Sequence, residues 1–343
     1  MKIAHIFYSL SYGGIETLIV NVANWQAKSG HSVSIVLIND IYEQGLIDLV
    51  DEQVDIIQLK RKPKTSAVMS VAKLNLCLLV KQFDILHIHA AEIGNIIQPF
   101  LKGQKILHVH STTAITNTVI PKYKKCIAIS NAVSQILINQ YDRKSQVIFN
   151  GVDFSKFQKR KLHSVAQKII AVGSLNTQVK NQDWIISEFS SIRDRVDANL
   201  YIVGHGPDRQ FLQDLIERLN LLDRVFLLGN KSQGWIQHNL CNYDLFVQAS
   251  LTEGLGISAI EAAASCVPLL LSNIDGHIEI AVNGELCDLF DPKVEGELAT
   301  AIVGFYNNTD QYFDAAAKNY DIHEWKFSFD LFNKKVIDLY NAL

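Results

Sequence analysis

Short apolar runs alternate with segments of helical periodicity along nearly the whole of this 343-residue chain. The runs have the length and the β-branched content of buried strands, and the segments between them place apolar residues three and four positions apart. Strands that alternate with helices fold as parallel sheets with right-handed crossovers. A polar, basic segment without periodicity, 158–167, separates two such series. We therefore expect an α/β fold of two doubly wound, Rossmann-like domains that face a ligand-binding cleft.

The apolar runs also set the expected strands and domain limits. The first series predicts strands at 2–8, 32–38, 55–59, 85–89, 106–110, 125–129 and 146–149, and the second predicts strands at 168–172, 199–203, 224–228, 244–247 and 267–271. Helices are expected at 70–81, 132–140, 181–192 and 208–219, among others. The domains should span 1–157 and 168–324, joined by a linker that includes 158–167. The amphipathic segment 325–343 should form a helix that packs back on the first domain.

The composition argues against several classes of protein. A formal net charge of −3 gives no general attraction to nucleic acid. No window of about 20 apolar residues predicts a membrane-spanning helix. The apolar run at 3–10 reads as a first strand and not as a signal peptide. The five cysteines are scattered without metal-binding spacing, which is typical of reduced residues in a cytosolic protein.

The stretch from Glu253 to Glu261 carries the clearest chemical signal. An apolar run precedes it and a segment of small residues follows it, which predicts a strand, a turn at Gly254 and Gly256, and a helix start. Such a turn offers free backbone N–H groups and the positive end of a helix dipole to a phosphate. Carboxylates on either side accept hydrogen bonds from sugar hydroxyls. We interpret the stretch as a nucleotide-sugar site; the alternative is two exposed acids that flank a turn.

The same stretch resembles the EX7E motif of the retaining glycosyltransferases of family 4, which have the GT-B fold. Four other segments are similar to that family in order and spacing. They are the loop 12–17 (YGGIET), the segment 149–153 (FNGVD), the loop 173–181 (GSLNTQVKN), and the segment 203–207 (VGHGP) with its downstream partner 224–229. The resemblance covers nearly the entire chain.

The resemblance implies a role for each residue of the motif. Glu261 would bind the ribose hydroxyls of a donor nucleotide, and Glu253 would contact hydroxyls of the transferred sugar. The backbone amides around Gly254, Leu255 and Gly256 would hold phosphate and sugar oxygens of the donor. The alternative interpretation as two exposed acids assigns no ligand to these residues.

Lys180 matches the lysine with which the family neutralises the donor diphosphate, a charge-assisted contact to a leaving group. A solvated loop lysine is the alternative. Ser174 stands where the family usually has arginine, so one cation is missing unless Arg209 or Lys231 replaces it. The resemblance assigns three glycines to the donor site as well, Gly14, Gly173 and Gly204.

Four histidines pair on two expected strands, His87 with His89 and His108 with His110. Each pair lies on one face of its strand, because side chains alternate along a strand. Neighbouring strands can bring the four imidazoles together, which would permit a metal site. No carboxylate completes a familiar ligand set and the family needs no metal, so we expect none. The resemblance equates His110 with a histidine that lines the donor-sugar pocket, and it leaves His87 and His108 in the interior.

Two residues of the first domain have both a structural and a functional interpretation. Ser130 follows an expected strand and precedes a helix, so it is a candidate N-cap, which we favour over the acceptor contact that the family implies. Glu16 either complements the N-terminus of its helix or lies in the acceptor site. The two interpretations of Glu16 are equally supported by the sequence.

Basic residues cluster at 60–64 and at 122–125, both in the first domain. A solvated loop is the first interpretation of each cluster. Attraction to anionic lipid at a cytoplasmic surface is the second, because each basic residue near such a surface contributes about 1 kcal/mol. The second interpretation fits the lipid-linked acceptors that many members of the family glycosylate.

The resemblance predicts a retaining hexosyltransferase that moves a hexosyl group from a nucleoside-diphosphate sugar to a hydroxyl of a glycan or lipid-linked oligosaccharide, in surface-polysaccharide synthesis. It implies a cytoplasmic enzyme with peripheral membrane contact, no metal or other cofactor, and no nucleic-acid partner. Two alternatives stay open. One is a non-catalytic nucleotide-sugar-binding subunit, which Ser174 suggests, and the other is an epimerase or a phosphorylase on the same scaffold.

Overall fold

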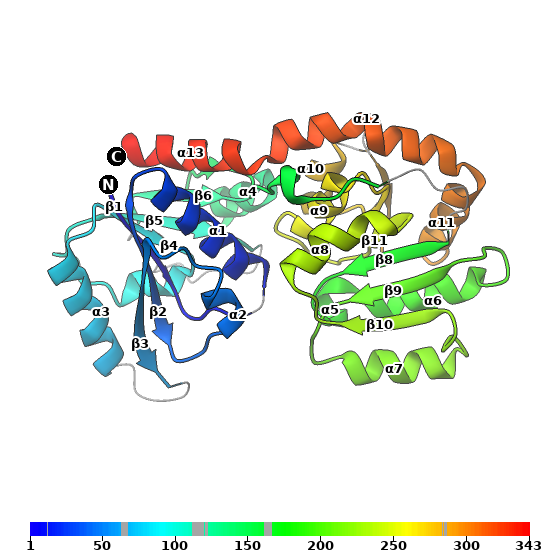
Figure 1. The fold of residues 1–343 in the computed structure, drawn as a ribbon, viewed down its shortest axis with the longest axis horizontal. Coiled ribbons are helices and arrows are strands. Elements are labelled where there is room, and N and C mark those ends of the chain that lie inside the picture. Colours follow the sequence, from blue (N-terminus) through cyan, green and yellow to red (C-terminus); the bar gives the residue numbers. More distant parts are fainter. Residues whose placement is uncertain are drawn as a thin grey trace. The chain divides into compact units, whose positions relative to one another are not determined.

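The computed structural model describes residues 1–11, 13–62, 68–111, 120, 123–160, 167–282, 284 and 287–343. The chain divides into two compact units, each a parallel sheet with helices (Figure 1). Unit 1 comprises Met1–Asn150 and Phe332–Leu343, and unit 2 comprises Gly151–Leu331. The sequence prediction set the corresponding limits at 157, 168 and 324.

Unit 1 is built on a seven-stranded sheet in the order β3-β2-β1-β4-β5-β6-β7, and all of its pairings are parallel. The strands are β1 (Lys2–Phe7), β2 (Ser32–Asn39), β3 (Val54–Arg61), β4 (Ile85–Ile88), β5 (Gln104–Val109), β6 (Lys125–Ala128) and β7 (Gln146–Val147). The helices are α1 (Gly14–Lys28), α2 (Gln44–Ile47), α3 (Val68–Lys81), η1 (Ala91–Asn95), α4 (Asn131–Tyr141) and the part of α13 (Phe329–Asn341) from Phe332 onwards.

Unit 2 is built on a six-stranded sheet in the order β10-β9-β8-β11-β12-β13, again parallel throughout. The strands are β8 (Lys168–Val172), β9 (Asn199–Val203), β10 (Val225–Gly229), β11 (Leu245–Gln248), β12 (Leu269–Ser272) and β13 (Asp288–Phe290). The helices are η3 (Phe154–Lys156), α5 (Thr177–Lys180), α6 (Gln182–Ile192), α7 (Arg209–Arg218), α8 (Gln233–Asn239), η4 (Leu240–Asn242), α9 (Ile257–Ala264), α10 (Asp275–Ala281), α11 (Glu297–Asn307) and α12 (Thr309–Phe327).

The topology confirms the predicted doubly wound architecture. In each sheet the first strand of the unit lies in the middle, and the chain adds strands on one side before it crosses to the other. The apolar runs lie inside these sheets because strands covered on both faces bury nearly all of their side chains. All four inner residues of β4 and of β11 are accordingly buried.

Three local features differ from the sequence prediction. The segment 325–343, expected as one helix, is divided at Ser328 between α12 and α13, and only the part from Phe332 onwards belongs to unit 1. The helix expected at 181–192 is preceded by a separate turn of helix, α5, because Asn181 adopts a left-handed conformation with φ of 56°. This break ends α5 at Lys180. Strand β13 was not predicted, since only three residues form it and one of them is acidic.

Part of the segment 158–167, which the sequence prediction assigned to a linker, is anchored in unit 2. The Arg160 guanidinium forms a buried ion pair with Asp244 and lies 3.7 Å from the centre of the Phe313 ring. The other oxygen of Asp244 accepts from the backbone N–H groups of Gln167 and Lys168, both at 2.8 Å. Residues 161–166 lie outside the described residues. A basic residue read as part of the linker therefore stabilises the start of the second sheet.

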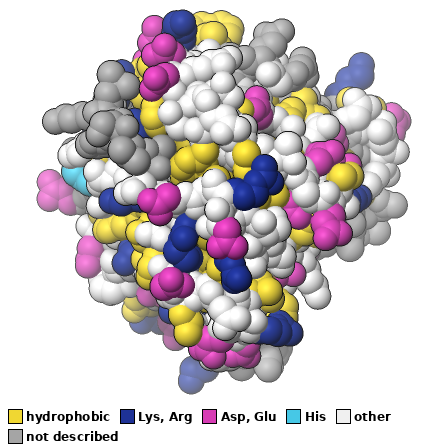
Figure 2. Space-filling view, turned by 90° about the vertical axis from the view of Figure 1, so that its right-hand side faces the viewer, with side chains coloured by type: hydrophobic (Ala, Val, Ile, Leu, Met, Phe, Trp, Pro, Cys, Tyr) yellow, Lys and Arg dark blue, Asp and Glu magenta, His cyan; other side chains and the backbone are white. Residues whose placement is uncertain are grey.

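Lys and Arg side chains are intermingled with Asp and Glu side chains on the face of the molecule seen in Figure 2. Among the helices that the structure describes, none has both the length and the apolar character needed to cross a bilayer.

Candidate active site

The candidate site lies at the carboxyl edge of the sheet of unit 2. Strand order reverses between β8 and β11, which are neighbours with the rest of the sheet on either side of them. In doubly wound sheets, ligands bind outside the carboxyl ends of the strands at this switch point. The loops that follow β8, β9, β11 and β12 carry the predicted donor-site residues and those that contact them.

The loops after β8 and β9 pack backbone against backbone. A Cβ atom on Gly204, whose φ is 152°, would lie 1.8 Å from the carbonyl oxygen of Gly173, and a Cβ atom on Gly206 would lie 2.2 Å from that of Leu175. The Leu175 N–H donates to the His205 carbonyl at 3.0 Å, which holds the loops together. The glycines at 204 and 206 thus let two loops meet at the sheet edge. The predicted donor contacts of Gly173 and Gly204 stay predictions.

The structure brings two predicted site residues together as an ion pair. The Lys180 ammonium at the end of α5 contacts Oε1 of Glu253, and both side chains are largely buried. The same oxygen accepts from Gln248 Nε2 at 2.6 Å and from Ser250 Oγ at 3.0 Å. Burial alone would raise the pKa of Glu253, but Lys180 and the hydrogen bonds to the carboxylate hold it below its ordinary value. Glu253 is therefore ionised and fixed in position.

His277 lies beside this pair and was not predicted. Its Nδ1 is 3.0 Å from Ser272 Oγ, and that hydroxyl donates to the Ser250 carbonyl. The proton is therefore on Nδ1, and Nε2 keeps a lone pair with no partner among the residues that the structure describes. Burial lowers the His277 pKa to about 4, although the nearby Glu253 opposes the shift. Nε2 is a buried hydrogen-bond acceptor next to the predicted turn.

The turn after β11 has the predicted form. Gly256 is left-handed, with φ of 91°, and stands at the N-cap of α9. A Cβ atom there would lie 3.0 Å from Cδ2 of His277, so a side chain would press on the imidazole. Leu255 is buried, which anchors the turn, while Gly254 is half-buried.

Glu261 lies on α9 and has a different environment from Glu253. Its Oε1 accepts from Gln233 Nε2 on α8 at 2.6 Å, and no cation pairs with it among the described ion pairs. Burial raises the pKa of Glu261 to about 7, and the bond from Gln233 only partly offsets this. The two carboxylates therefore differ in charge near neutral pH, with Glu253 ionised and Glu261 partly protonated.

Ser174 is exposed on the loop after β8, and its carbonyl accepts from Gln182 Nε2 at 2.7 Å. The two residues considered as replacements for the missing cation have other contacts. Arg209 donates to the Leu227 carbonyl at 3.4 Å, and the Lys231 ammonium lies 5.3 Å from the centre of the Trp235 ring. Their participation stays a hypothesis.

Three predicted residues lie at helix starts in unit 1. Ser130 is fully buried and its Oγ accepts from the Val133 N–H at 3.1 Å, which confirms the N-cap interpretation. Gly14 is the first residue of α1. Glu16 lies in the first turn of α1 and its carboxylate accepts from Ser11 Oγ at 3.3 Å. That position fits the helix-terminus interpretation of Glu16, and the acceptor contact is untested.

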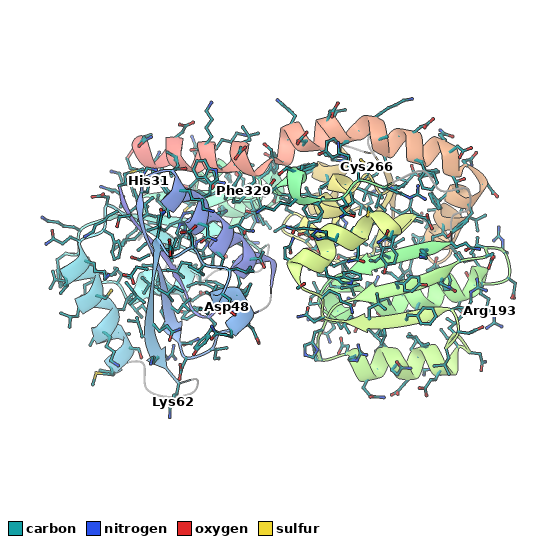
Figure 3. The ribbon with its side chains drawn as sticks, viewed as in Figure 1. His31, Asp48, Lys62, Arg193, Cys266 and Phe329 are labelled. Carbon is teal, nitrogen blue, oxygen red and sulfur yellow. The ribbon has the colours of Figure 1, made fainter. Side chains whose placement is uncertain are left out.

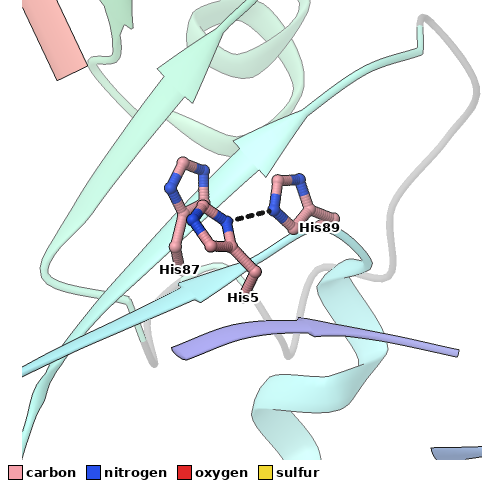
Figure 4. A group of neighbouring side chains, drawn as sticks. All are labelled: His5, His87 and His89. Atoms are coloured by element: carbon pink, nitrogen blue, oxygen red, sulfur yellow. Dashed lines mark hydrogen bonds between the residues drawn. The ribbon is translucent and has the colours of Figure 1, made fainter. Parts of the chain in front are cut away.

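The paired histidines do come together, and a fifth joins them. We call His5, His87, His89, His108 and His110 the histidine cluster. His5 Nδ1 lies 3.1 Å from His89 Nε2 (Figure 4), and His89 Nδ1 lies 3.0 Å from His110 Nε2. His87 Nε2 lies 3.1 Å from His108 Nδ1, and its Nδ1 contacts the hydroxyl of Tyr340 on α13. Strands β1, β4 and β5 are neighbours in the sheet, which places these imidazoles side by side.

Burial keeps the histidine cluster neutral. The pKa of His5 falls to about 4 and that of His110 to about 3, and those of the other three lie well below the usual value. Two trios bring one ring nitrogen of each member within 4.8 Å of the others: His5, His87 and His89, and His89, His108 and His110. Neutral imidazoles are metal ligands, but most of these nitrogens are paired with each other. The expectation of no metal stays a prediction.

Three of the missed residues share one property. Gln248, Ser250 and Ser272 are polar residues at or just after the ends of apolar strands, the place where a doubly wound sheet binds its ligand. His277 lies on α10, the helix that follows β12. Gln233, at the start of α8, gave no such signal. Attention to polar residues at strand ends would have identified the first three.

Two family profiles together match residues 12–321. The profile described as Glycosyltransferase Family 4 matches residues 12–156, and the one described as Glycosyl transferases group 1 matches residues 153–321. Among curated proteins, N-acetyl-alpha-D-glucosaminyl L-malate synthase of Bacillus anthracis is 28% identical over 242 residues. The aligned part is 62% of this chain and 63% of the synthase, so the chain spans slightly less than two thirds of that relative.

Two solved structures share the fold over its full length. A glycosyltransferase from Rickettsia africae superposes with a TM-score of 0.84 at 21% identity, covering 99% of this chain and 97% of that one. HepE of Anabaena, in complex with UDP and glucose, superposes with a TM-score of 0.85 at 19% identity, covering 100% of both chains. At these identities the likeness establishes the fold and leaves the ligands of this chain to be argued from its own residues.

Proposed function

Because the chain belongs to the glycosyltransferases of family 4 and has their GT-B architecture, we propose that it is a retaining hexosyltransferase that takes its sugar from a nucleoside-diphosphate donor. HepE, whose fold it shares, binds UDP and glucose. The relative from Bacillus anthracis is named for a glucosaminyl product. Both support a nucleotide-sugar donor, and a UDP-sugar is the first candidate.

The observation that carries the proposal is the Lys180–Glu253 pair at the switch point of unit 2. An ammonium held at this place stabilises the charge that develops on a departing diphosphate. An ionised carboxylate beside it accepts hydrogen bonds from sugar hydroxyls. The Nε2 lone pair of His277 adds a second acceptor for a hydroxyl. Glu261, farther along α9, is proposed to accept from the ribose.

We propose that the reaction proceeds by front-face attack. The bond from the anomeric carbon to the phosphate oxygen breaks with its electron pair on the oxygen, and the acceptor oxygen bonds to the same face of the carbon. The acceptor proton passes to the departing phosphate, whose charge Lys180 stabilises. Glu253 is tied to Lys180, Gln248 and Ser250, which suits a positioning role better than that of a covalent nucleophile. No metal is assigned a step, since Lys180 supplies positive charge at the leaving group.

The acceptor is proposed to be a hydroxyl of a glycan or of a lipid-linked oligosaccharide. Surface-polysaccharide synthesis on the cytoplasmic side of a membrane is the setting proposed with it. A non-catalytic nucleotide-sugar-binding subunit is the second candidate, and the serine at 174 in place of arginine favours it.

The test separates donor binding from turnover. Glu261→Ala should abolish calorimetric binding of UDP, and Lys180→Ala should lower turnover more than donor affinity. Lys168→Ala, which removes the same charge at the opposite end of β8, is the matched control and should change neither. Unchanged UDP binding in both site variants would overturn the site assignment. NMR of the product should show the donor's anomeric configuration; an inverted product would refute the retaining mechanism.

A further inference from the structure

The segment 56–83 of unit 1 contains no acidic residue, whereas the whole chain has a formal net charge of −3. The segment covers most of β3, the connection after it, and α3. Five described basic residues lie in it, Lys60, Arg61, Lys62, Lys73 and Lys81, and of these Lys81 is ion-paired with Asp55. Residues 63–67 lie outside the described residues. This concentration of positive charge differs from the mixed face seen in Figure 2.

Helix α3 turns apolar side chains toward solvent. Its inner face is made by Leu74 and Leu78, which are 0% and 2% exposed. The outer side has five large apolar residues with exposed fractions between 51% and 76%: Val68, Met69, Leu76, Leu79 and Val80. Residues 69, 73, 76 and 80 are three and four positions apart, so they follow one face of the helix, with Lys73 among them. A surface helix ordinarily places polar residues there.

The apolar surface continues beyond the helix. The side chain of Asn75 donates to the Ile96 carbonyl and accepts from the Gln98 N–H, both at 2.8 Å, which fixes the segment 96–98 against α3. Phe100, two residues farther on, is 72% exposed. Lys62, labelled in Figure 3, lies near the start of α3 at the end of the edge strand β3. On α3 itself, the exposed Lys73 lies among the exposed apolar side chains.

We propose that the outer face of α3 docks on an anionic lipid bilayer, with its apolar side chains in the interface and its lysines on lipid phosphates. Interfacial helices have this combination of apolar anchors and basic residues, because lysine stems lie along the apolar surface while the ammonium reaches the headgroups. Each basic residue near an anionic surface increases binding about fivefold.

The same charges argue against a second copy of the chain as the occupant. A two-fold interface brings the same patch of both copies together, so the basic residues of one copy would face those of the other. An anionic lipid surface complements them instead. The helix also cannot span the bilayer, since it is 14 residues long. The contact is therefore parallel to the membrane surface.

This inference deepens the membrane setting of the proposed function, and its test needs no sugar transfer. The full chain is sedimented with vesicles of phosphatidylcholine, with and without one third phosphatidylglycerol, at low and high salt. We expect binding only to the anionic vesicles at low salt. The double variant Leu76→Ser/Val80→Ser should lose binding at least tenfold, and Lys73→Glu should weaken it. Unchanged thermal unfolding and UDP binding would show that the variants fold.

Matched controls lie in unit 2. Leu222→Ser removes an apolar residue that is 59% exposed, and Lys318→Glu reverses an exposed charge on α12. Neither should alter vesicle binding. Equal binding by Leu76→Ser/Val80→Ser and the unmodified chain would overturn the proposal. So would a lipid-free dimer that the double variant dissociates, because the face would then bind a second copy. If the unmodified chain binds anionic vesicles but not UDP, the donor site is refuted and this inference stands.

Discussion

Donor affinity should rise about tenfold from about pH 6 to about pH 8, and Glu261→Gln should remove that rise. Burial raises the pKa of Glu261 to about 7 in the ligand-free protein. In the proposed site the ribose hydroxyls donate hydrogen bonds to Glu261, and an ionised carboxylate accepts them more strongly than the neutral acid does. Binding therefore selects the ionised form of Glu261 and releases a proton wherever the free protein holds one.

The magnitude follows from the two pKa values. The ordinary pKa of the group is 4.5 and its value in the structure is about 7, so ionising Glu261 costs about 3 kcal/mol more than in water. About a tenth of the molecules have Glu261 ionised at about pH 6 and about nine tenths at about pH 8. The same shift lowers the stability of the ligand-free protein as pH rises from about 4.5 to about 7, since the folded state holds the proton more tightly than the unfolded chain.

Calorimetric titration with UDP-glucose measures both quantities. Its diphosphate diester keeps one charge state across this range, so the ligand does not contribute to the pH dependence. Titrations in two buffers of different ionisation enthalpy count the protons released, which should approach one per site at about pH 6. Glu261→Gln keeps an oxygen for the Gln233 amide but cannot titrate. Affinity that is flat with pH in the native protein, or equally steep in Glu261→Gln, would refute the reasoning.

Three further outcomes are expected. Gly204→Ala should lower the free energy of unfolding in urea by about 2–4 kcal/mol, because its Cβ would collide with the Gly173 carbonyl. Gly296 also has a positive φ, but no described atom lies within 4 Å of the position of a Cβ. Gly296→Ala should therefore lower the free energy of unfolding by only about 1 kcal/mol. An equal loss in the two variants would contradict the packing argument. Ser174→Arg should raise kcat several-fold by adding a cation at the leaving group, while Gln178→Arg in the neighbouring α5 should not. No difference between the two variants would refute the assignment. Acidification should destabilise unit 1. Below about pH 6.5 the unfolded chain binds protons on these histidines and the folded chain does not, so each imidazole of the histidine cluster lowers the free energy of unfolding by about 1.4 kcal/mol per pH unit. Urea midpoints that do not change from about pH 7.5 to about pH 5.5 would contradict this.

The sequence was sufficient for most of the sheet architecture. Buried parallel strands are mostly apolar, so the runs at 85–89 and 244–247 could be recognised without any tertiary contact, although they include His87, His89 and Asp244. Strand β13 lacks such a run and was missed. The break at Asn181 depends on one left-handed residue, and asparagine adopts that conformation too seldom to predict it.

The contacts within the site were predictable only between residues that are close in sequence. Glu253, Gly256 and Glu261 belong to one strand-turn-helix unit, and the structure gives the turn the form expected. The ion pair of Glu253 with Lys180 joins residues 73 positions apart, and the bond between Glu261 and Gln233 joins residues from two helices. Those contacts decide which carboxylate is ionised, and no local pattern encodes them. His5 was missed for the same reason, since it meets its partners across the sheet.

The hydrogen bonds of the histidine cluster determine which ring nitrogen carries the proton along the row from His5 to His110. Gln26 on α1 presents its carbonyl oxygen to His5 Nε2 at 2.8 Å, and a carbonyl oxygen only accepts. His5 must then carry its proton on Nε2 and accept at Nδ1 from His89, which in turn accepts from His110. Every imidazole in that row is forced into one orientation of donor and acceptor. A glutamine on a helix thereby determines, across three neighbouring strands, that Nδ1 of His110 at the sheet edge is an acceptor.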